Sequence, residues 1–401
     1  MLDAYIYDGL RSPIGRHAGA LSGIRPDDLA AMMVKALVER AGFPQDAYED
    51  VILGCTNQAG EDSRNVARFA GLLAGLPVET GGATVNRLCA SGLQAVVDAA
   101  RAVTVGEGDL FVAGGVESMS RAPFVLGKAE QPFAREAHIY DSTIGWRFPN
   151  PKVLKAFGAD TMPETADNVA RELQISRADS DAFAARSQSR YEAARADGFF
   201  AAEIEPVTLP AKRKDAPPTI VSTDEHPRPS STLEALAKLK PLAEDGVVTA
   251  GNASGVNDGA AALVVGSRTM GERHGKAPRA RIVAAAAAGV PPRVMGLGPV
   301  PAIRKALERA NLRLADVDVI EINEAFAPQV LGCLKELNIP FDDPRVNPNG
   351  GAIAVGHPLG CSGARLALTA VRELERRGGK RAVVSLCIGI GQGLAAVIER
   401  V

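Results

Sequence analysis

The chain is poor in aromatic residues and has few cysteines. Aromatics make up 4% of its 401 residues, and there is a single tryptophan. The five cysteines are an odd number, are scattered along the chain, and include no Cys-x-x-Cys pair. This distribution argues against a disulfide framework or a zinc site, so we expect reduced thiols in a cytosolic protein. Some of these thiols are therefore candidates for chemical reactivity.

The chain also lacks an excess of charge of either sign and a long apolar run. Its formal net charge of -2 at pH 7 gives no reason to expect nucleic acid or an anionic membrane as a partner. Gly and charged residues interrupt the apolar stretches, so we expect none of them to span a bilayer. The N-terminal segment MLDAYIYDGLRSP lacks the basic start, apolar middle and cleavage site of a secretion signal. We therefore expect a cytoplasmic protein.

What the sequence does contain is an alternation of short apolar strands and amphipathic helices. Gly occurs 41 times, and small residues favour close packing of helices on sheets. The alternation predicts a layered α/β fold with mainly parallel sheets, and the length predicts two or three structural units. Strands are predicted at 4–7, 50–53, 110–113, 261–265, 281–286, 317–322, 382–386 and 394–398, and helices at 26–40, 63–74, 91–105, 165–172, 178–196, 301–310, 324–337 and 362–377.

An internal repeat divides the chain into two halves. The segment CASGLQAVVDAARAVTVGEGDLFVAGG, from Cys89, aligns with CSGARLALTAVRELERRGGKRAVVSLCIG, from Cys361. In each, a Cys and a Ser-Gly pair open a helix, a Gly-rich turn follows, and a buried strand ends in Gly. Two such halves predict duplicated α/β units packed face to face, with ligand sites at their shared border.

The region between the halves has a different composition. From about residue 121 to 248 the Pro density rises and the only tryptophan, Trp146, occurs. We predict that residues 121–248 form a loop domain over the active site, where ligand contacts are usual. Residues 1–120, completed by about 249–270, are predicted as the N-terminal half, and 271–401 as the C-terminal half.

Two segments contain residue types suited to nucleophilic catalysis. Cys89, in VNRLCASG, lies where a strand gives way to a helix, and the helix dipole and free N–H groups lower the pKa of a thiol placed there. A buried structural cysteine is an equal alternative. His357, in GGAIAVGHPLGCSG, is held by a dense Gly run, whereas we expect most of the other histidines at the surface. A histidine beside a thiol is the usual arrangement for activating it.

Two further segments are ambiguous when each is taken alone. Cys387 ends an apolar strand and enters IGIGQG, where a thiol could exchange protons with a substrate. A dinucleotide-binding Gly motif is the competing interpretation, but the GLAAVIERV that follows alternates like a strand rather than a helix. Asn323, in EINEAFA, stands at a strand end, where its amide could hold a water or a carbonyl oxygen. It could equally be a helix N-cap, with Glu324 in the first turn.

Together, VNRLCASG, INEAFA, GGAIAVGHPLGCSG and CIGIGQG resemble the four active-site blocks of the thiolase family in order and spacing, and the likeness covers the whole chain. It implies the thiolase fold, in which two duplicated βαβαβαββ halves form a five-layered αβαβα core with an inserted loop domain. It also implies that Cys89 is the acylated nucleophile and that His357 is its base and an oxyanion donor. Cys387 would be the second acid/base, and Asn323 would position an oxyanion water. The N–H groups of Cys89 and Gly389 would form the other oxyanion hole.

The resemblance implies cleavage of a 3-oxoacyl-CoA through an acyl-cysteine, with CoA as a substrate and with no metal or redox cofactor. Contacts with CoA are implied for Met162, Arg228 and Ser254, although some biosynthetic thiolases have His-Met where this chain has Thr-Met. The segments DSTIGWRFPNP and DTMPETADN resemble the thiolases that act on 3-oxoadipyl-CoA, a substrate with a terminal carboxylate. Arg147 is a candidate partner for that carboxylate, and a solvated surface arginine is the alternative.

Other interpretations of the same residues remain open. An acetoacetyl-CoA thiolase that runs in the condensing direction would use the same site. A 3-oxoacyl carrier-protein synthase also has a Cys nucleophile, but it relies on a His pair or a His–Asn pair where this chain has His357 and Cys387. A non-catalytic lipid-binding or scaffold relative is disfavoured, because all four side chains of the site are present. The family likeness also implies a homo-oligomer, either a dimer or a tetramer.

Overall fold

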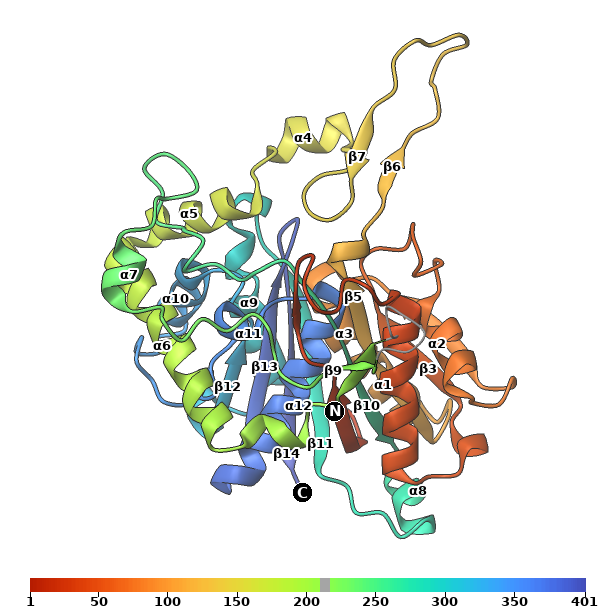
Figure 1. Ribbon diagram of the computed structural model, residues 1–401. Coiled ribbons are helices and arrows are strands. Elements are labelled where there is room, and N and C mark those ends of the chain that lie inside the picture. The colour runs from red at the N-terminus through yellow and green to blue at the C-terminus, as the bar shows by residue number, and fades with distance from the viewer. Residues whose placement is uncertain (210–216) are drawn as a thin grey trace.

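The computed structural model describes residues 1–209 and 217–401, so residues 210–216, in the predicted loop domain, lie outside the described part. A ten-stranded sheet runs through the centre of the molecule (Figure 1). Its strands lie in the order β12 (Val319–Ile322), β13 (Arg381–Ile388), β14 (Gln392–Arg400), β11 (Ala280–Gly289), β1 (Ala4–Arg11), β10 (Asn257–Gly266), β5 (Leu110–Ser118), β3 (Asp50–Gly54) and β4 (Gly81–Val85), with β2 (Gly15–Arg16) paired to β10. All eight strands predicted from the sequence are present.

The sheet consists of two parts that correspond to the two halves of the chain. Strands β4, β3, β5, β10 and β1 form one part, and β11, β14, β13 and β12 form the other. They are joined where β1 pairs with β11 over three residue pairs, from Ala4 with Ile282 to Ile6 with Ala280. Strand β10 follows the insertion in sequence and returns to lie between β1 and β5 of the first part.

The prediction of mainly parallel sheets is wrong, because the sheet is mixed. Parallel pairing is confined to β3 with β4, β3 with β5, and β12 with β13 among the described strands, and the other pairs of the large sheet are antiparallel. Strands β13 and β14 form a hairpin in which Ile388 pairs with Gln392, and such a short connection requires antiparallel strands. Strand direction depends on the connections, which hydrophobic patterning does not reveal.

Helices cover the sheet in layers, as the duplicated architecture predicts. Helices α1 (Pro26–Ala41) and α2 (Val66–Ala74) cover the outer face of the first part, α9 (Pro299–Arg309) and α10 (Ala327–Glu336) cover the outer face of the second, and α3 (Ser91–Val105) and α12 (Leu359–Arg377) lie between the two parts. One buried apolar cluster surrounds the central helices and contacts both parts of the sheet, and a separate cluster lies under the outer helices of each part. The αβαβα order expected for the thiolase fold is confirmed.

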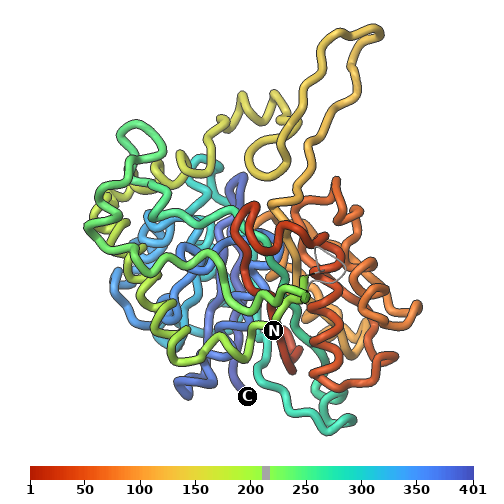
Figure 2. Tube along the Cα trace, in the orientation of Figure 1, coloured from red at the N-terminus to blue at the C-terminus, as the bar shows by residue number. Residues whose placement is uncertain are grey.

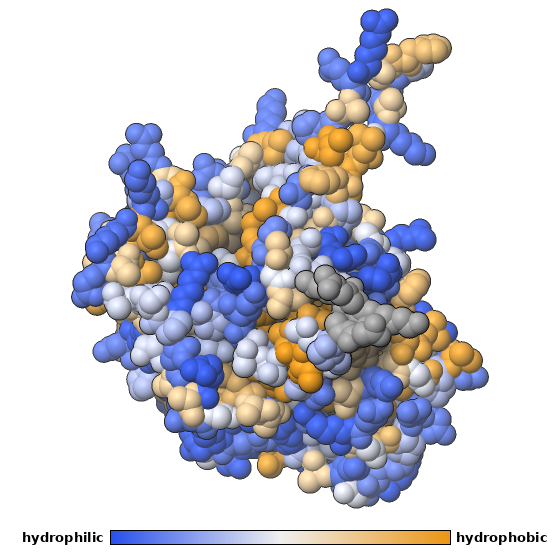
Figure 3. Space-filling view, viewed as in Figure 1, coloured by the Kyte–Doolittle hydropathy of each residue, from blue (hydrophilic) through white to orange (hydrophobic). Residues whose placement is uncertain are grey.

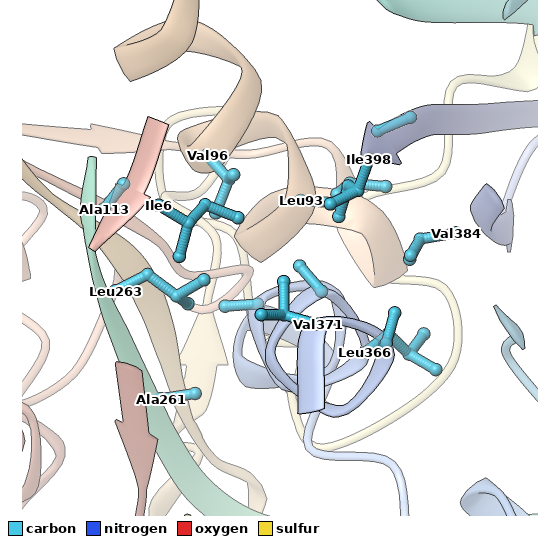
Figure 4. Close-up of a cluster of buried hydrophobic side chains, with 14 of the residues drawn as sticks. Ile6, Leu93, Val96, Ala113, Ala261, Leu263, Leu366, Val371, Val384 and Ile398 are labelled. Atoms are coloured by element: carbon cyan, nitrogen blue, oxygen red, sulfur yellow. The ribbon is translucent and has the colours of Figure 1, made fainter. Parts of the chain in front are cut away.

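Alternation along the strands assigns side chains to these layers. In β1, Ala4 and Ile6 face the central helices, whereas Tyr5 and Tyr7 face the outer helices. The same period of two recurs along β14 of the second part. Figure 4 shows side chains of both central helices and of strands from both parts in one cluster. The central helices are thus buried around most of their circumference, and α12 buries Arg365 and Glu373 along with its apolar residues.

The burial of α3 explains a feature that the sequence analysis missed. The segment Leu88–Val105 is long and apolar enough to cross a membrane by length and composition, contrary to the expectation that no stretch would qualify. However, 67% of it is buried inside the protein, where α3 packs against α12 and β5. Its apolar character is therefore explained by its place in the core.

Among its described residues, the region between the halves contains helices of 5 to 20 residues and strands of three residues. They are β6 (Phe124–Leu126), β7 (Ile139–Asp141), α4 (Pro151–Phe157), α5 (Met162–Leu173), α6 (Arg177–Ala196), β8 (Val207–Leu209), β9 (Thr219–Val221) and α7 (Leu233–Ala237), while α8 (Arg268–Arg273) and α11 (Ala352–Val355) are short helices outside it. Helices α5 and α6 pack against α10. Strands β6 and β7 form a narrow arm that projects from the body (Figures 1 and 2).

Candidate active site

The four candidate segments lie at strand ends and helix starts of the central layer. Cys89 lies in a short 3₁₀ turn, Leu88–Ala90, between β4 and α3. His357 lies between α11 and α12, Cys387 is the penultimate residue of β13, and Asn323 directly follows β12. Each residue therefore lies within or directly next to a helix or strand, and the two duplicated halves both contribute to the site.

Two glycines allow the starts of α3 and α12 to touch. A Cβ on Gly92 would lie 2.4 Å from the carbonyl oxygen of Gly360, and a Cβ on Gly363 would lie 2.3 Å from the backbone nitrogen of Leu93. Neither position can therefore carry a side chain without separating the helices. Gly92 and Gly363 occupy matching positions in the internal repeat, so the duplication brings the Cys89 turn next to the segment that follows His357.

The hydrogen bonds of His357 define its tautomer. Its Nδ1 lies 2.7 Å from Oγ of Ser362, and that hydroxyl donates its own hydrogen to the carbonyl oxygen of Pro358 at 2.9 Å. Ser362 must therefore accept from Nδ1–H, which leaves Nε2 without a proton. Nε2 faces Nδ2 of Asn323 at 3.3 Å, where it accepts from the amide. The imidazole is thus set to accept a proton at Nε2.

Burial keeps this imidazole neutral. Loss of solvent, with a smaller contribution from the positive charge of Arg365, lowers the pKa of His357 from 6.5 to about 3. The backbone N–H of His357 donates to Oδ1 of Asn257 at 2.9 Å, which fixes the main chain at this point. A neutral, oriented imidazole is the form that a general base requires.

The side-chain amide of Asn323 makes a hydrogen bond through one of its two polar atoms. Its Nδ2 contacts His357, whereas among the described residues its buried Oδ1 has no hydrogen-bond partner. The backbone N–H of Asn323 donates to the carbonyl oxygen of Ser385, which ties the residue to β13. The N-cap alternative is wrong, because α10 begins only at Ala327, with Phe326 as its N-cap residue. Asn323 instead presents its amide to the interior of the site.

The turn that carries Cys89 has a constrained backbone. Leu88 has a φ of 45°, in the left-handed region that a branched side chain rarely adopts. Its N–H donates to Oδ1 of Asn86 at 2.9 Å, and its carbonyl oxygen accepts from Oγ of Ser91 at 2.6 Å. Ser91 in turn accepts from the N–H of Arg87 at 2.8 Å. These bonds hold the strained turn that carries the thiol.

The Cys89 thiol is not acidic in this structure, which corrects the expectation of a lowered pKa. Burial raises the pKa of Cys89 to about 11, although the backbone N–H of Gly389 and its own N–H oppose the rise. The same two N–H groups were assigned to an oxyanion hole, and both are near the sulfur. A position at a helix start does not lower the pKa of Cys89 here, because the loss of solvent raises that pKa by more than the helix dipole lowers it. Deprotonation therefore needs a base.

Cys387 is fully buried, with 0% exposure. Burial raises its pKa well above the ordinary value, and the neighbouring Cys89 raises it further. A thiol tuned to titrate near neutral pH is therefore not what the structure shows, and Cys387 is held protonated. It packs in a small apolar cluster with Met295 and Phe326, and Met162 lies against the same cluster.

The three candidate CoA contacts lie around this cluster and on the insertion side. Met162 begins α5, and its Sδ lies 4.0 Å from the place of a Cβ on Gly389. The N–H of Ser254 donates to the carbonyl oxygen of Ala325 at 2.9 Å. Arg228 is exposed and lines a cavity of about 140 Å³ with Gln188 and His226 among its other walls. Met162 thus reaches the thiols, whereas Arg228 lies at the outer surface.

Arg147 lies near the Cys89 turn rather than free in solvent. Its two terminal nitrogens donate to the carbonyl oxygens of Ser142 at 3.1 Å and of Thr56 at 3.4 Å. The Thr56 carbonyl also accepts from Nδ2 of Asn86, which holds Leu88. The guanidinium thus shares an acceptor with the residue that braces the nucleophile turn.

Several residues at the site were not identified from the sequence. Ser362 lies within the quoted motif GHPLGCSG, and Asn257 lies three residues after Ser254, but only the fold brings them to His357. His226 is only 8% exposed, contrary to the surface location expected for most of the other histidines, and burial lowers its pKa to about 4. Glu117 is buried beside the turn that contains Thr56. No periodicity in the sequence distinguishes these polar residues from surface ones.

The arrangement is suited to acyl transfer. It combines a thiol near two backbone N–H groups, a neutral imidazole whose unprotonated Nε2 faces Asn323, and a buried thiol beside the first. The first pair can generate and acylate a thiolate, and the N–H groups can stabilise an oxyanion. The second thiol can supply a proton to a carbon.

Comparison with known proteins agrees with this geometry. Residues 4–269 match the family description "Thiolase, N-terminal domain", and residues 276–400 match "Thiolase, C-terminal domain". The chain is 60% identical over 403 residues to a "Beta-ketoadipyl-CoA thiolase" of Escherichia coli, with 100% of both covered, and 59% identical over 401 residues to one of Pseudomonas aeruginosa, with 100% of the chain and 99% of the relative covered.

Solved structures agree with these sequence comparisons. The Bacillus anthracis acetyl-CoA acetyltransferase superimposes with a TM-score of 0.93 at 41% identity, covering 100% of the chain and 99% of that structure. Human mitochondrial 3-ketoacyl-CoA thiolase in complex with CoA superimposes with a TM-score of 0.91 at 40% identity, covering 100% and 98%. With both family domains matched and the relatives aligned over their full lengths, the chain belongs to the thiolase family.

Proposed function

We propose that this protein cleaves 3-oxoadipyl-CoA with CoA to give succinyl-CoA and acetyl-CoA. The observation that carries the proposed chemistry is the pairing of a neutral His357, whose Nε2 is an acceptor, with two neighbouring thiols, the partly exposed Cys89 and the buried Cys387. This set supplies a nucleophile, its base and a separate acid. A decarboxylating condensing enzyme would have no use for the second thiol.

In the first half-reaction, His357 Nε2 takes the proton of Cys89, and the thiolate attacks the 3-oxo carbon. The resulting alkoxide collapses, so that the bond between C2 and C3 breaks and the acyl group stays on Cys89. Cys387 gives its proton to C2 of the departing enolate, and acetyl-CoA leaves. The pKa of Cys387, raised by burial, suits a group that must remain protonated until this moment.

In the second half-reaction, CoA enters the site that acetyl-CoA has left. The Cys387 thiolate takes the proton of the CoA thiol, and the CoA thiolate attacks the acyl carbonyl on Cys89. The tetrahedral intermediate expels Cys89, which regains its proton from His357. The oxyanion of this step would be held by the N–H groups of Cys89 and Gly389, both of which are near the sulfur. His357, Cys89 and Cys387 thus recover their starting protonation states, with the proton of the CoA thiol replacing the one that Cys387 gave to acetyl-CoA, and the kinetics are ping-pong.

The other oxyanion site would involve Asn323 and His357. Once protonated, His357 Nε2 becomes a donor, and Asn323 would hold a water next to it. The buried Oδ1 of Asn323 has no partner among the described residues, which is consistent with a bound water there. Preorganised donors of this kind contribute about 3–4 kcal/mol each to the stabilisation of an oxyanion.

The choice of substrate is supported by the relatives and by Arg147. The proteins named "Beta-ketoadipyl-CoA thiolase" align with the whole chain at 56–60% identity, compared with 42% for an "Acetyl-CoA acetyltransferase" of Thiocystis violacea. Arg147 donates two hydrogen bonds to backbone carbonyls, and its remaining N–H groups are available to a carboxylate. We assign CoA contacts to Met162, Arg228 and Ser254, and the human relative was solved in complex with CoA.

We also propose a cytoplasmic homo-oligomer, either a dimer or a tetramer. The cysteines are all free, as expected in a reducing compartment. The arm formed by β6 and β7 exposes a set of large apolar side chains (Figure 3), which a second copy would cover. These are Phe124, Leu126, Phe133 and Ile139. Size-exclusion chromatography with light scattering measures the assembly directly, and a monomer would refute this part.

Two measurements test the proposed reaction. Incubation with 3-oxoadipyl-CoA and without CoA should leave a succinyl group on Cys89, which peptide mass spectrometry locates. Label on another cysteine, with Cys89 unmodified, would refute the nucleophile. A comparison of kcat/KM for 3-oxoadipyl-CoA and acetoacetyl-CoA tests the substrate. A preference for acetoacetyl-CoA would refute the substrate assignment but leave the thiolase chemistry intact.

A further inference from the structure

Glu117, near the end of β5, is a buried carboxylate that the proposed reaction does not use. It is 2% exposed and accepts three backbone N–H bonds, from Thr56 at 3.0 Å, Asn57 at 3.1 Å and Gly360 at 2.9 Å. Three N–H donors favour the ionised carboxylate, while burial acts in the opposite direction and raises the pKa of Glu117. A charged group in the core with so many backbone donors has a structural or electrostatic purpose.

The bonds of Glu117 join the two sides of the active site. Gly360 lies in the first turn of α12, three positions after His357, so Glu117 places a negative charge at the start of that helix. On the other side, Thr56 accepts at its carbonyl oxygen from Asn86, which holds the N–H of Leu88. A short chain of hydrogen bonds therefore leads from Glu117 to the turn of Cys89.

The charge of Glu117 acts on the thiols around it. The pKa of Cys89 is raised chiefly by burial and also by Glu117, which is the one side-chain charge among the leading influences on this thiol. Glu117 acts in the same direction on Cys55, which follows β3, and on Cys361 of α12, where burial is again the larger cause. The charge of Asp62 acts with Glu117 on Cys55. On Cys361, Arg11 and Arg365 oppose Glu117, whereas Asp224 acts with it. Of these thiols, only Cys89 is partly open to solvent.

We propose that Glu117 is a positioning residue that ties the start of α12 to the Cys89 turn and that its charge adds to the effect of burial in holding Cys89 as a thiol until His357 removes its proton. A thiolate present before the substrate binds would react with oxidants and alkylating agents, because the thiolate is the reactive form. Glu117 thus adds to the protection that burial gives the nucleophile in the resting enzyme. The second role, in which His357 takes the proton, rests on the proposed function.

Alkylation of the resting enzyme tests this inference without any CoA substrate. The rate of iodoacetamide modification of Cys89 is measured against pH, and peptide mass spectrometry assigns the label. In the wild type, the pKa obtained should lie above the ordinary value of about 8.5 for a cysteine. In Glu117→Gln the pKa of the Cys89 thiol should fall by about one unit, the scale expected for loss of one neighbouring charge. At a pH below both pKa values, Cys89 of the variant should then be alkylated about tenfold faster than that of the wild type.

Two further variants separate charge from structure. Glu117→Asp keeps the charge but shortens its reach, so the pKa of the Cys89 thiol should stay near that of the wild type. Glu324→Gln is the matched control, because Glu324 is also a buried carboxylate with three donors, from Ser187, Asn347 and Ile353. This variant should lower the melting temperature without moving the alkylation pKa.

The inference is overturned by any of three results. The first is an alkylation pKa below the ordinary value in the wild type, which can be measured even if Glu117→Gln does not fold. The second is a Glu117→Gln pKa equal to that of the wild type. The third is a shift in Glu117→Asp as large as that in Glu117→Gln. None of these results bears on whether the enzyme cleaves 3-oxoacyl-CoA, so failure here and failure of the proposed reaction are distinguishable.

Discussion

Removal of the Ser362 hydroxyl should impair the base without disturbing the rest of the site. Ser362 is 1% exposed, accepts from Nδ1–H of His357 at 2.7 Å and donates to the carbonyl oxygen of Pro358 at 2.9 Å. In Ser362→Ala the Nδ1–H has no acceptor, and a buried donor left unpaired costs about 1–3 kcal/mol. The alternative tautomer avoids that cost but carries its proton on Nε2, where it cannot act as a base.

Asn323 disfavours the tautomer of His357 that carries its proton on Nε2. Its Nδ2 still donates toward Nε2 of His357 at 3.3 Å, so a proton on Nε2 would face another donor. We therefore expect Ser362→Ala to cost about 1–2 kcal/mol, the lower part of the range for an unpaired buried donor. This cost lowers kcat/KM for thiolysis by about 5- to 30-fold. The pH profile should keep its shape, because the residues that titrate are unchanged.

The assay compares Ser362→Ala with a matched serine variant. Ser385 is also fully buried, and its hydroxyl donates to the carbonyl oxygen of Leu394 at 2.9 Å, with no contact to His357. Ser385→Ala should lose a similar amount of stability while its kcat/KM stays within about twofold of the wild type. If kcat/KM of Ser362→Ala also stays within twofold, the tautomer of His357 does not depend on this hydroxyl and the reasoning is refuted.

Three further predictions follow from the same geometry. Cys387→Ser should still form acyl-Cys89, detected by mass spectrometry, but lose most cleavage of the carbon–carbon bond, and near-normal turnover would contradict the proposed acid. Arg147→Ala should reduce the preference for 3-oxoadipyl-CoA over acetoacetyl-CoA by about tenfold to a hundredfold, while Arg135→Ala, which changes an exposed arginine of the same insertion, should not. The pKa of His357 is about 3 in the folded protein against 6.5 for an ordinary histidine, so between these values the unfolded chain binds the extra proton and stability falls as the pH falls. Denaturant unfolding measures the free energy of unfolding at pH 7 and at about pH 5. Between these values the wild type should lose about 2 kcal/mol more than His357→Asn. Equal losses would contradict a neutral buried imidazole.

The positions of the main helices and strands could be predicted because they depend on local patterning. Helix α3 occupies the predicted range 91–105, and α1 begins at Pro26 and is followed by Gly42 with a φ of 64°. Pro at a helix start and Gly after its end act through nearest neighbours. Strand β4, with the sequence GGATV, was missed, because its glycines and small side chains carry little of the apolar alternation that marks a strand.

Protonation states could not be predicted in the same way. The sequence places Cys89 at a helix start, which favours a low pKa, but burial in the folded protein raises it to about 11. Cys387 and His357 depart from near-neutral titration for the same reason. The loss of solvent around a side chain depends on residues from distant segments, and it outweighs the local dipole.

The sequence by itself determined the repeat, the layered α/β class, and four motifs whose chemistry requires a thiol, an imidazole, an amide and a second thiol. Only the tertiary structure decided that these groups share one site and in which state each is held. Gly92 and Gly363 let the two central helices touch, Ser362 and Asn323 fix the tautomer of His357, and Glu117 joins both sides of the site. Patterning along a chain reports which face is buried, whereas contacts between residues far apart in sequence depend on how the halves pack.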